Sequence, residues 1–156
     1  MSKIHNPASI AAPIGTYSHG IEVPPNARWL HVSGQVAVRK DGSVPVAIEE
    51  QTVVAWENIA AILASAGMKI TDIVKINQYL TDPAYFPAYA GARRRLLGEH
   101  RPASTLVMIS ALVKPEFLVE VEVVAASAAP ARKPAKRPQR VAAAKQPKRA
   151  AVKRRR

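Results

Sequence analysis

Apolar residues in the middle of the chain recur at the spacing of an amphipathic helix. Residues 48–66, IEEQTVVAWENIAAILASA, place them every three or four positions, which builds one apolar stripe. Glu49 and Glu50 suit the positive N-terminal end of a helix, and Gly67 is the residue type that commonly follows the last turn. The pattern therefore predicts a first helix over residues 48–66.

A second helix is predicted from Asp82 to about His100. Asp82 is a good N-cap residue, and Pro83 suits the first helical position because no backbone N–H donor is needed there. Residues 93–95, three arginines, lie inside this helix. Three consecutive helical residues fan over roughly 200°, so we expect this run to form a solvated side of the helix.

The other apolar segments alternate apolar and polar residues or are rich in β-branched residues, as strands are. Residues up to about Thr16 contain several prolines and are expected to form a loop. Residues 40–43, KDGS, predict a tight turn. We expect strands over residues 17–23, 28–33 with an extended continuation at 35–38, 72–80, 105–112 and 118–125.

This order of elements predicts one domain of the α+β class, with a mixed sheet of five to six strands and both helices on one face. A length of 156 residues fits a single domain. The segments VKINQYL and LVEVEVVA alternate apolar and polar side chains, so the face without helices carries both kinds. A broad mixed face is typical of a surface that meets another subunit.

The net charge of +12 belongs to one end of the chain. Residues 127–156 hold twelve Lys or Arg and no acidic residue, while residues 1–126 hold eleven residues of each sign. The last segment consists mainly of Ala, Pro, Lys and Arg. These bury too little apolar surface to offset the entropy of ordering, so we expect 127–156 to be a disordered basic tail. Such a tail either binds nucleic acid or another polyanion without sequence preference, or serves as a solubilising extension.

Composition argues against several classes of protein. Cysteine is absent, which excludes disulfides, thiolate catalysis and cysteine zinc sites, and fits a reducing compartment. There is no apolar run of about 18 residues and no apolar signal segment near the start, so we expect a cytoplasmic protein that does not enter a membrane. The four histidines lack the spacing of a metal motif, so we expect no metal site.

Several of these segments, in this order, resemble the RidA (YjgF/YER057c/UK114) family. They are GTYSHG, VSGQ, AGMKITDIVKINQYLTD, RPAST and VEVEVVA, and together they extend over roughly residues 10–126. The resemblance implies a chorismate-mutase-like α+β fold and a homotrimer with clefts between its subunits. It also implies hydrolysis of reactive enamines and imines, such as 2-iminopropanoate and 2-iminobutanoate, to 2-oxo acids and ammonia, without a metal or organic cofactor.

Matched position by position, the resemblance assigns site roles to residues of this chain. Tyr17 matches a tyrosine that shapes the cleft, and Ser33 and Gly34 belong to the matching SGQ segment. Glu120, on the last expected strand, matches a glutamate that helps to place water, which makes it the expected catalytic residue.

The residue that would hold a substrate carboxylate does not match. Family members have an arginine in the turn P-A-R-S/T, whereas residues 102–105 read PAST, so Ser104 stands in its place. The hydroxyls of Ser104 and Thr105 either cap the turn or line the cleft, and their hydrogen bonds are roughly half as strong as charge-assisted ones. Losing the charged anchor costs about 2–4 kcal/mol. Arg101, three residues upstream, is either a substitute ligand or a solvated or ion-paired side chain, and Ala90 lies nearest to an asparagine that some members bring from the second helix.

The residues alone leave ordinary alternatives open. Glu120 and Glu122 are two apart on a strand and share a face, so they are either a general acid/base site or a solvated or subunit-paired surface. Tyr17 is otherwise a core or interface aromatic, and Gly34 otherwise marks a β-bulge. The histidines at strand positions are expected to be structural.

We therefore expect a RidA-like protein that hydrolyses small enamine or imine metabolites, with weak or no activity on the standard 2-imino acids because Ser104 replaces arginine. One alternative is a non-catalytic trimer that binds a small metabolite in its intersubunit cleft. Another is a protein directed to nucleic acid or another polyanion by its basic tail, residues 127–156.

Overall fold

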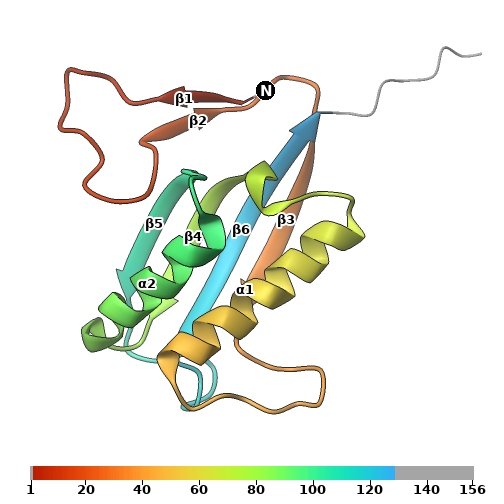
Figure 1. The fold of residues 1–156 in the computed structure, drawn as a ribbon, viewed down its shortest axis with the longest axis vertical. Coiled ribbons are helices and arrows are strands. Elements are labelled where there is room, and N and C mark those ends of the chain that lie inside the picture. The colour runs from red at the N-terminus through yellow and green to blue at the C-terminus, as the bar shows by residue number, and fades with distance from the viewer. Residues whose placement is uncertain (1, 129–156) are drawn as a thin grey trace, which may run out of the picture.

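The computed structural model describes residues 2–128 (Figure 1). The expected tail therefore lies outside the described residues, apart from Ser127 and Ala128, which end the last strand. No helix in the described part is long and apolar enough to cross a membrane. The elements are β1 (Lys3–His5), β2 (Gly20–Glu22), β3 (Ala27–Gln35), α1 (Ile48–Ser65), η1 (Ile70–Asp72), β4 (Ile73–Leu80), η2 (Pro83–Tyr85), α2 (Phe86–Leu97), β5 (Ala103–Met108) and β6 (Val119–Ala128).

Four of the strands form one mixed sheet in the order β3-β6-β4-β5. β6 pairs antiparallel with both β3 and β4, and β4 pairs parallel with β5. The helices α1 and α2 pack side by side over one face of this sheet (Figure 1). The predicted α+β class is confirmed. The strands are divided between two sheets, however, because β1 and β2 form a small sheet of their own.

The N-terminal segment differs most from the sequence expectation. The strand expected over residues 17–23 shortens to β2 and pairs with β1, which lies where a loop was expected. Just before β2, Ser18 runs along the start of β5, where its N–H donates to the carbonyl oxygen of Pro102 at 3.1 Å and its hydroxyl to that of Arg101 at 2.6 Å. These contacts between distant segments place residues 16–18 beside β5, and no local pattern encodes them.

Both helices begin and end near the predicted residues because their end signals act as expected. Gly67 follows α1 with a φ of +66°, in the left-handed region that favours glycine. The Asp82 carboxylate accepts a hydrogen bond from the N–H of Ala84 at 2.7 Å, and so caps the 3₁₀ turn η2 that leads into α2. α2 ends at Leu97, three residues before the predicted end at His100.

The core fills the space between the two helices and the inner face of the main sheet. Each layer contributes large side chains that are almost completely buried. Burial of each such side chain stabilises the fold by about 1.5–3 kcal/mol. The main contributors are Trp56, Ile59 and Leu63 of α1, Tyr89 and Leu97 of α2, Ile76 and Leu80 of β4, and Val121 and Val123 of β6.

A buried amide ties the start of α1 to the loop that leads into β6. Gln51 is fully buried, and its Nε2 donates to the carbonyl oxygens of Pro45 and Glu116, both at 2.7 Å. Its Oε1 accepts from the N–H of Leu118 at 2.9 Å. Since Glu120 follows two residues later, these bonds also fix where the expected catalytic side chain leaves the backbone.

Replacing this amide tests its contribution. We expect Gln51→Leu to lower the free energy of unfolding by about 2–4 kcal/mol, because it leaves one buried and two partly buried backbone groups without their partner, at roughly 1–3 kcal/mol each and partly offset by water. Chemical denaturation measures the difference. The control Glu57→Leu, at an exposed position of the same helix, should change stability by less than about 0.5 kcal/mol. Wild-type stability in Gln51→Leu would contradict this role.

Candidate functional site

The alternation of side chains along β4 divides the expected site residues between the two faces of the sheet. Gln78 is buried in the helix layer, where its side chain meets Tyr89 of α2. Its neighbours Asn77 and Tyr79 point to the opposite, open face, because successive residues of a strand alternate. Glu120 pairs with Tyr79 in the antiparallel register and therefore lies on the open face too.

Glu120 lies over the backbone of Gly34 on the neighbouring strand β3. A Cβ atom at residue 34 would sit 1.7 Å from Glu120 Oε1 and 2.6 Å from its carboxyl carbon, so a glycine is needed for this side chain to lie where it does. The register of β3 against β6 shifts between Val32 and Gln35. The bulge predicted at Gly34 is therefore confirmed, and the carboxylate of Glu120, which belongs to β6, lies directly over it.

The two carboxylates of β6 are held differently. Glu122 Oε1 accepts hydrogen bonds from Asn77 Nδ2 at 2.5 Å and from the Tyr79 hydroxyl at 3.2 Å, whereas no group within residues 2–128 donates to Glu120. Burial, and then the carboxylates of Glu122 and Glu120, raise the pKa of Tyr79, so its hydroxyl stays protonated as a donor. Glu122 is thus held by two side chains of β4, whereas the carboxylate of Glu120 has no such partner within residues 2–128.

A groove of about 300 Å³ opens on the same face beside Glu122. Ser33 and Lys75 line it, and Lys75 Nζ donates to Thr105 Oγ1 at 2.6 Å, so Thr105 also belongs to this face. Within residues 2–128, no three His, Asp or Glu side chains gather closely enough to hold a metal ion. The open face therefore offers carboxylates, an ammonium and hydroxyls as its chemical groups.

Ser104 faces the other way, into the space beside α2. Gln78 Nε2 donates to Ser104 Oγ at 2.7 Å and to the carbonyl oxygen of Thr105 at 2.9 Å. The Tyr89 hydroxyl donates to Gln78 Oε1, and this bond determines which end of the amide serves as donor. Ser104 is therefore the last member of a buried hydrogen-bond chain, on the face opposite Glu120.

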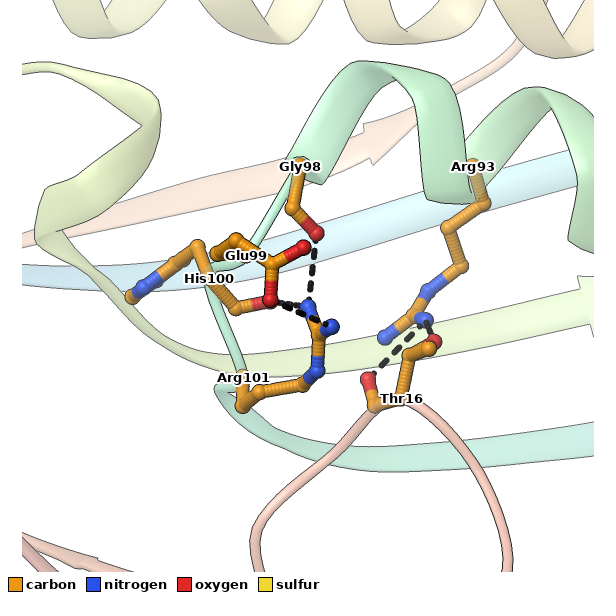
Figure 2. Close-up of polar contacts among 6 residues, drawn as sticks. All are labelled: Thr16, Arg93, Gly98, Glu99, His100 and Arg101. Atoms are coloured by element: carbon orange, nitrogen blue, oxygen red, sulfur yellow. Dashed lines mark hydrogen bonds and ion pairs between the residues drawn. The ribbon is translucent and has the colours of Figure 1, made fainter.

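Arg93 of α2 reaches the same space and is buried, with only 7% of its surface exposed. Its Nη1 donates to the carbonyl oxygen of Thr16 at 3.2 Å and to Thr16 Oγ1 at 2.7 Å (Figure 2). Its Nη2 lies 3.4 Å from Ser104 Oγ. The expectation of a solvated side for residues 93–95 is wrong for Arg93, although the two arginines after it are exposed.

The sequence contained a signal for this burial. Tyr89, Arg93 and Leu97 are spaced four residues apart, so they form one stripe of α2, and Tyr89 and Leu97 are core residues. A charged residue within an apolar stripe indicates a buried charge. The run of three arginines does not reveal the burial of Arg93 by itself, because consecutive helical residues point in different directions.

Arg101 is occupied at the C-terminal end of α2. Its Nη1 donates to the carbonyl oxygens of Gly98 at 2.6 Å and His100 at 3.1 Å, and its Nη2 to the Glu99 carboxylate at 3.2 Å (Figure 2). The end of a helix leaves carbonyl groups unpaired and favours a nearby cation. Most N–H donors of Arg101 that are shown are therefore already bonded to groups of the same chain.

Tyr17 is half-buried in the segment that passes the start of β5. Its ring lies edge-to-face against His19, with 5.9 Å between the ring centroids. The preceding residue, Thr16, is the one that Arg93 binds. The structure thus places Arg93 and Ser104 on the helix side at the β5 edge, with Arg101 at the end of α2. Ser33, Gly34, Thr105 and Glu120 form an open-face group.

Comparison with known proteins agrees with this architecture. The sequence model of the family described as Endoribonuclease L-PSP matches residues 8–127. A RutC family protein of Pyrococcus abyssi is 36% identical over 115 residues, which are 72% of this chain and 87% of that protein. The 2-iminobutanoate/2-iminopropanoate deaminase of Escherichia coli is 30% identical over 129 residues, 80% of this chain and 98% of that protein. The structure of YyfB, a Rid family protein of Yersinia pestis, has a TM-score of 0.71 at 27% identity and covers 80% of this chain and 97% of its own.

The contact between Glu120 and Gly34 can be measured as a coupling. We expect Gly34→Ala to cost about 1–3 kcal/mol of stability, as overpacking does. In a Glu120→Ala background the cost should fall, because the carboxyl group that meets the new methyl group is gone. Chemical denaturation of both single variants and the double variant should give a coupling of about 1 kcal/mol or more.

A matched control separates this contact from a general effect of alanine. Gly20→Ala places its Cβ no closer than 3.6 Å to a neighbour, the Cβ of His5, so it should behave alike with or without Glu120→Ala. Strict additivity of Gly34→Ala and Glu120→Ala would contradict the close packing described here.

Proposed function

The chain belongs to the RidA/YjgF family, and on this premise we propose that it hydrolyses the C=N bond of small reactive imines, or of the enamines in equilibrium with them. The products are a carbonyl compound and ammonia. The family match spans residues 8–127, nearly all of the described chain. The name of the Escherichia coli relative, a 2-iminobutanoate/2-iminopropanoate deaminase, supports this reaction class.

The observation that carries the proposal is the free carboxylate of Glu120 over the glycine bulge. Its oxygens have no donor within residues 2–128, while Glu122 beside it is tied to Asn77 and Tyr79. A carboxylate in this state can accept a proton from a bound water molecule, which is how a general base activates water. A side chain held by neighbouring donors, as Glu122 is, suits a structural role better.

The proposed reaction is balanced without a further reactant. Glu120 takes a proton from water while the water oxygen bonds to the carbon of the protonated imine, which gives a neutral carbinolamine. Glu120 then returns this proton to nitrogen. The C–N bond breaks and ammonia leaves, while the carbinolamine hydroxyl gives its proton back to the Glu120 carboxylate as the carbon–oxygen double bond forms; Glu120 then passes that proton to the departing ammonia, which leaves as ammonium. Carbon keeps its oxidation state, so no electron acceptor or donor takes part.

We further propose that the active unit is a homotrimer with its clefts between subunits. Glu120 lies on the open face of the sheet, while Ser104 and Arg93 lie on the helix side. One small substrate cannot touch both groups within a single chain, because the sheet separates them. A neighbouring chain that sets its open face against the β5 edge would bring the two groups together, and the mixed polarity of that face supports such a contact.

Turnover of an imine generated in solution tests the reaction. The missing arginine at position 104 predicts weak turnover of 2-imino acids, but the guanidinium of Arg93 lies beside Ser104. With 2-iminobutanoate released by an amino-acid oxidase, we therefore expect the wild-type chain to accelerate formation of 2-oxobutanoate. Glu120→Gln should reduce the rate about 10²–10⁴-fold, the usual contribution of a general base. Glu57→Gln, at an exposed position of α1, should leave the rate unchanged. A folded wild-type protein that gives no acceleration over buffer would contradict the proposal and favour a non-catalytic metabolite-binding trimer.

A further inference from the structure

Arg93 is a buried cation without an acidic partner. It is 7% exposed, and within residues 2–128 no carboxylate forms an ion pair with it. Arg95, two residues further along α2 and exposed, pairs with Glu49 instead. Burying an unpaired charge is costly, so a protein retains one where a counter-charge arrives from outside or where the charge has another use.

The donors of Arg93 are only partly used. A guanidinium carries five N–H donors, and here Nη1 binds Thr16, while Nη2 makes only a long contact of 3.4 Å to Ser104 Oγ. Nε is buried and has no hydrogen-bond partner. On the edge of the guanidinium formed by Nε and Nη2, the long contact to Ser104 is therefore the only hydrogen bond within residues 2–128. Two parallel N–H groups on one such edge match the two oxygens of a carboxylate.

Ser104 supplies a further donor at the same place. Its oxygen already accepts from Gln78 Nε2, and Tyr89 fixes that amide so that its donor end faces Ser104. Within residues 2–128 the hydroxyl hydrogen of Ser104 has no acceptor, so it is available to an incoming anion.

The guanidinium of Arg101 approaches that of Arg93 in this space (Figure 2). Burial, and also the charge of Arg101, hold the pKa of Arg93 below its ordinary value. The carboxylate of Glu99, which forms an ion pair with Arg101, is exposed to solvent. The space beside Ser104 therefore carries a positive potential that an anion would neutralise.

We propose that Arg93 of α2 is the residue that binds the carboxylate of the substrate in this chain, with the Ser104 hydroxyl as a second donor. The cation that the sequence lacks at position 104 is supplied from the helix, and a serine at 104 leaves room for it. The substrates would then be small imines that bear a carboxylate. The substrate assignment rests on the proposed function, whereas the anion-binding role of Arg93 does not.

A purely structural role is the competing explanation. The hydrogen bonds from Arg93 to Thr16 connect the segment that contains Tyr17 to α2, and so help to hold this segment beside β5. Thr16→Val removes the shorter of these bonds and keeps the guanidinium. If Arg93 is only a fastener, Thr16→Val and Arg93→Gln should have similar effects. If Arg93 binds an anion, only Arg93→Gln should abolish the preference for a charged ligand.

Calorimetric titration of the full chain with 2-oxobutanoate and with uncharged 2-butanone tests the proposal. We expect the wild type to bind 2-oxobutanoate and to bind 2-butanone far more weakly. Arg93→Gln should weaken 2-oxobutanoate binding by about tenfold or more, as loss of a charged two-point contact does, and leave 2-butanone unaffected. Arg94→Ala, the exposed neighbour, and Thr16→Val should retain the preference. Wild-type binding of 2-oxobutanoate by folded Arg93→Gln would overturn the proposal.

Moving the guanidinium from position 93 to position 104 by mutation gives a second readout. Ser104→Arg alone should weaken 2-oxobutanoate binding, because it sets another guanidinium against Arg93. The double variant Arg93→Gln/Ser104→Arg should recover binding. If Arg93→Gln does not fold, Arg93→Lys replaces it; this variant keeps the charge but loses the two-point edge, and should bind several-fold more weakly than the wild type. Equal or stronger binding by Arg93→Lys or by Ser104→Arg alone would count against the proposal.

The two proposals fail separately. Binding of 2-oxobutanoate that depends on Arg93, with no imine turnover by the wild type, would overturn the hydrolase function and leave the anion site standing. Imine turnover whose KM does not change in Arg93→Gln would overturn the anion site and leave the hydrolase function standing. Arg93→Gln is expected to raise the KM for the imino acid, whereas Glu120→Gln lowers kcat and leaves 2-oxobutanoate binding intact.

Discussion

The alternation of side chains along a strand is the constraint on which the rest of this structure depends. Because α1 and α2 cover one face of the sheet, every second residue of β4 enters the core and the others point to the open face. Gln78 is thereby committed to the helix side with Ser104, and Tyr79 to the open face with Glu120. The sheet therefore separates Ser104 from Glu120, and a second chain would be needed to bring such groups together.

The proposed role of Arg93 moves a binding group from one element to another while its chemistry is kept. A strand residue such as Ser104 and a helix residue such as Arg93 meet in the same space, since α2 packs over the sheet there. A guanidinium that enters from either element can present the same two-point edge to a carboxylate. The buried chain of Tyr89 and Gln78 then fixes the orientation of the serine. The position of the charge in space matters for such a site, and its position in the sequence does not.

Local signals predicted those parts of the fold that local interactions determine. The stripe over residues 48–66, the cap at Asp82 and the glycine at residue 67 identified both helices, and the bulge at Gly34 was expected from a glycine within a strand. The hairpin of β1 and β2 was missed because it depends on pairing across a long loop. Of the site, Glu120 and Gly34 were named from the sequence, but their contact was not, since it joins two strands that are far apart in the chain.

Arg93 was missed for a different reason. Its burial follows from the four-residue spacing with Tyr89 and Leu97, yet the two arginines after it make the segment look like a solvated surface. The contact with Thr16, a residue 77 positions away in sequence, then determines what the guanidinium can do. A charge inside an apolar helical stripe is a more informative signal than the number of charges around it.

The most direct test of a site shared between two chains is complementation between subunits that each lack one of the two groups. Glu120→Gln and Arg93→Gln would be produced together so that the proposed trimers are mixed. Imine hydrolysis would be measured well below the wild-type KM and compared with each variant alone. One interface in four then joins an intact Arg93 to an intact Glu120, so the account predicts recovery of about a quarter of wild-type activity. Activity no greater than the sum of the two separate variants, in trimers shown by mass to be mixed, would contradict it.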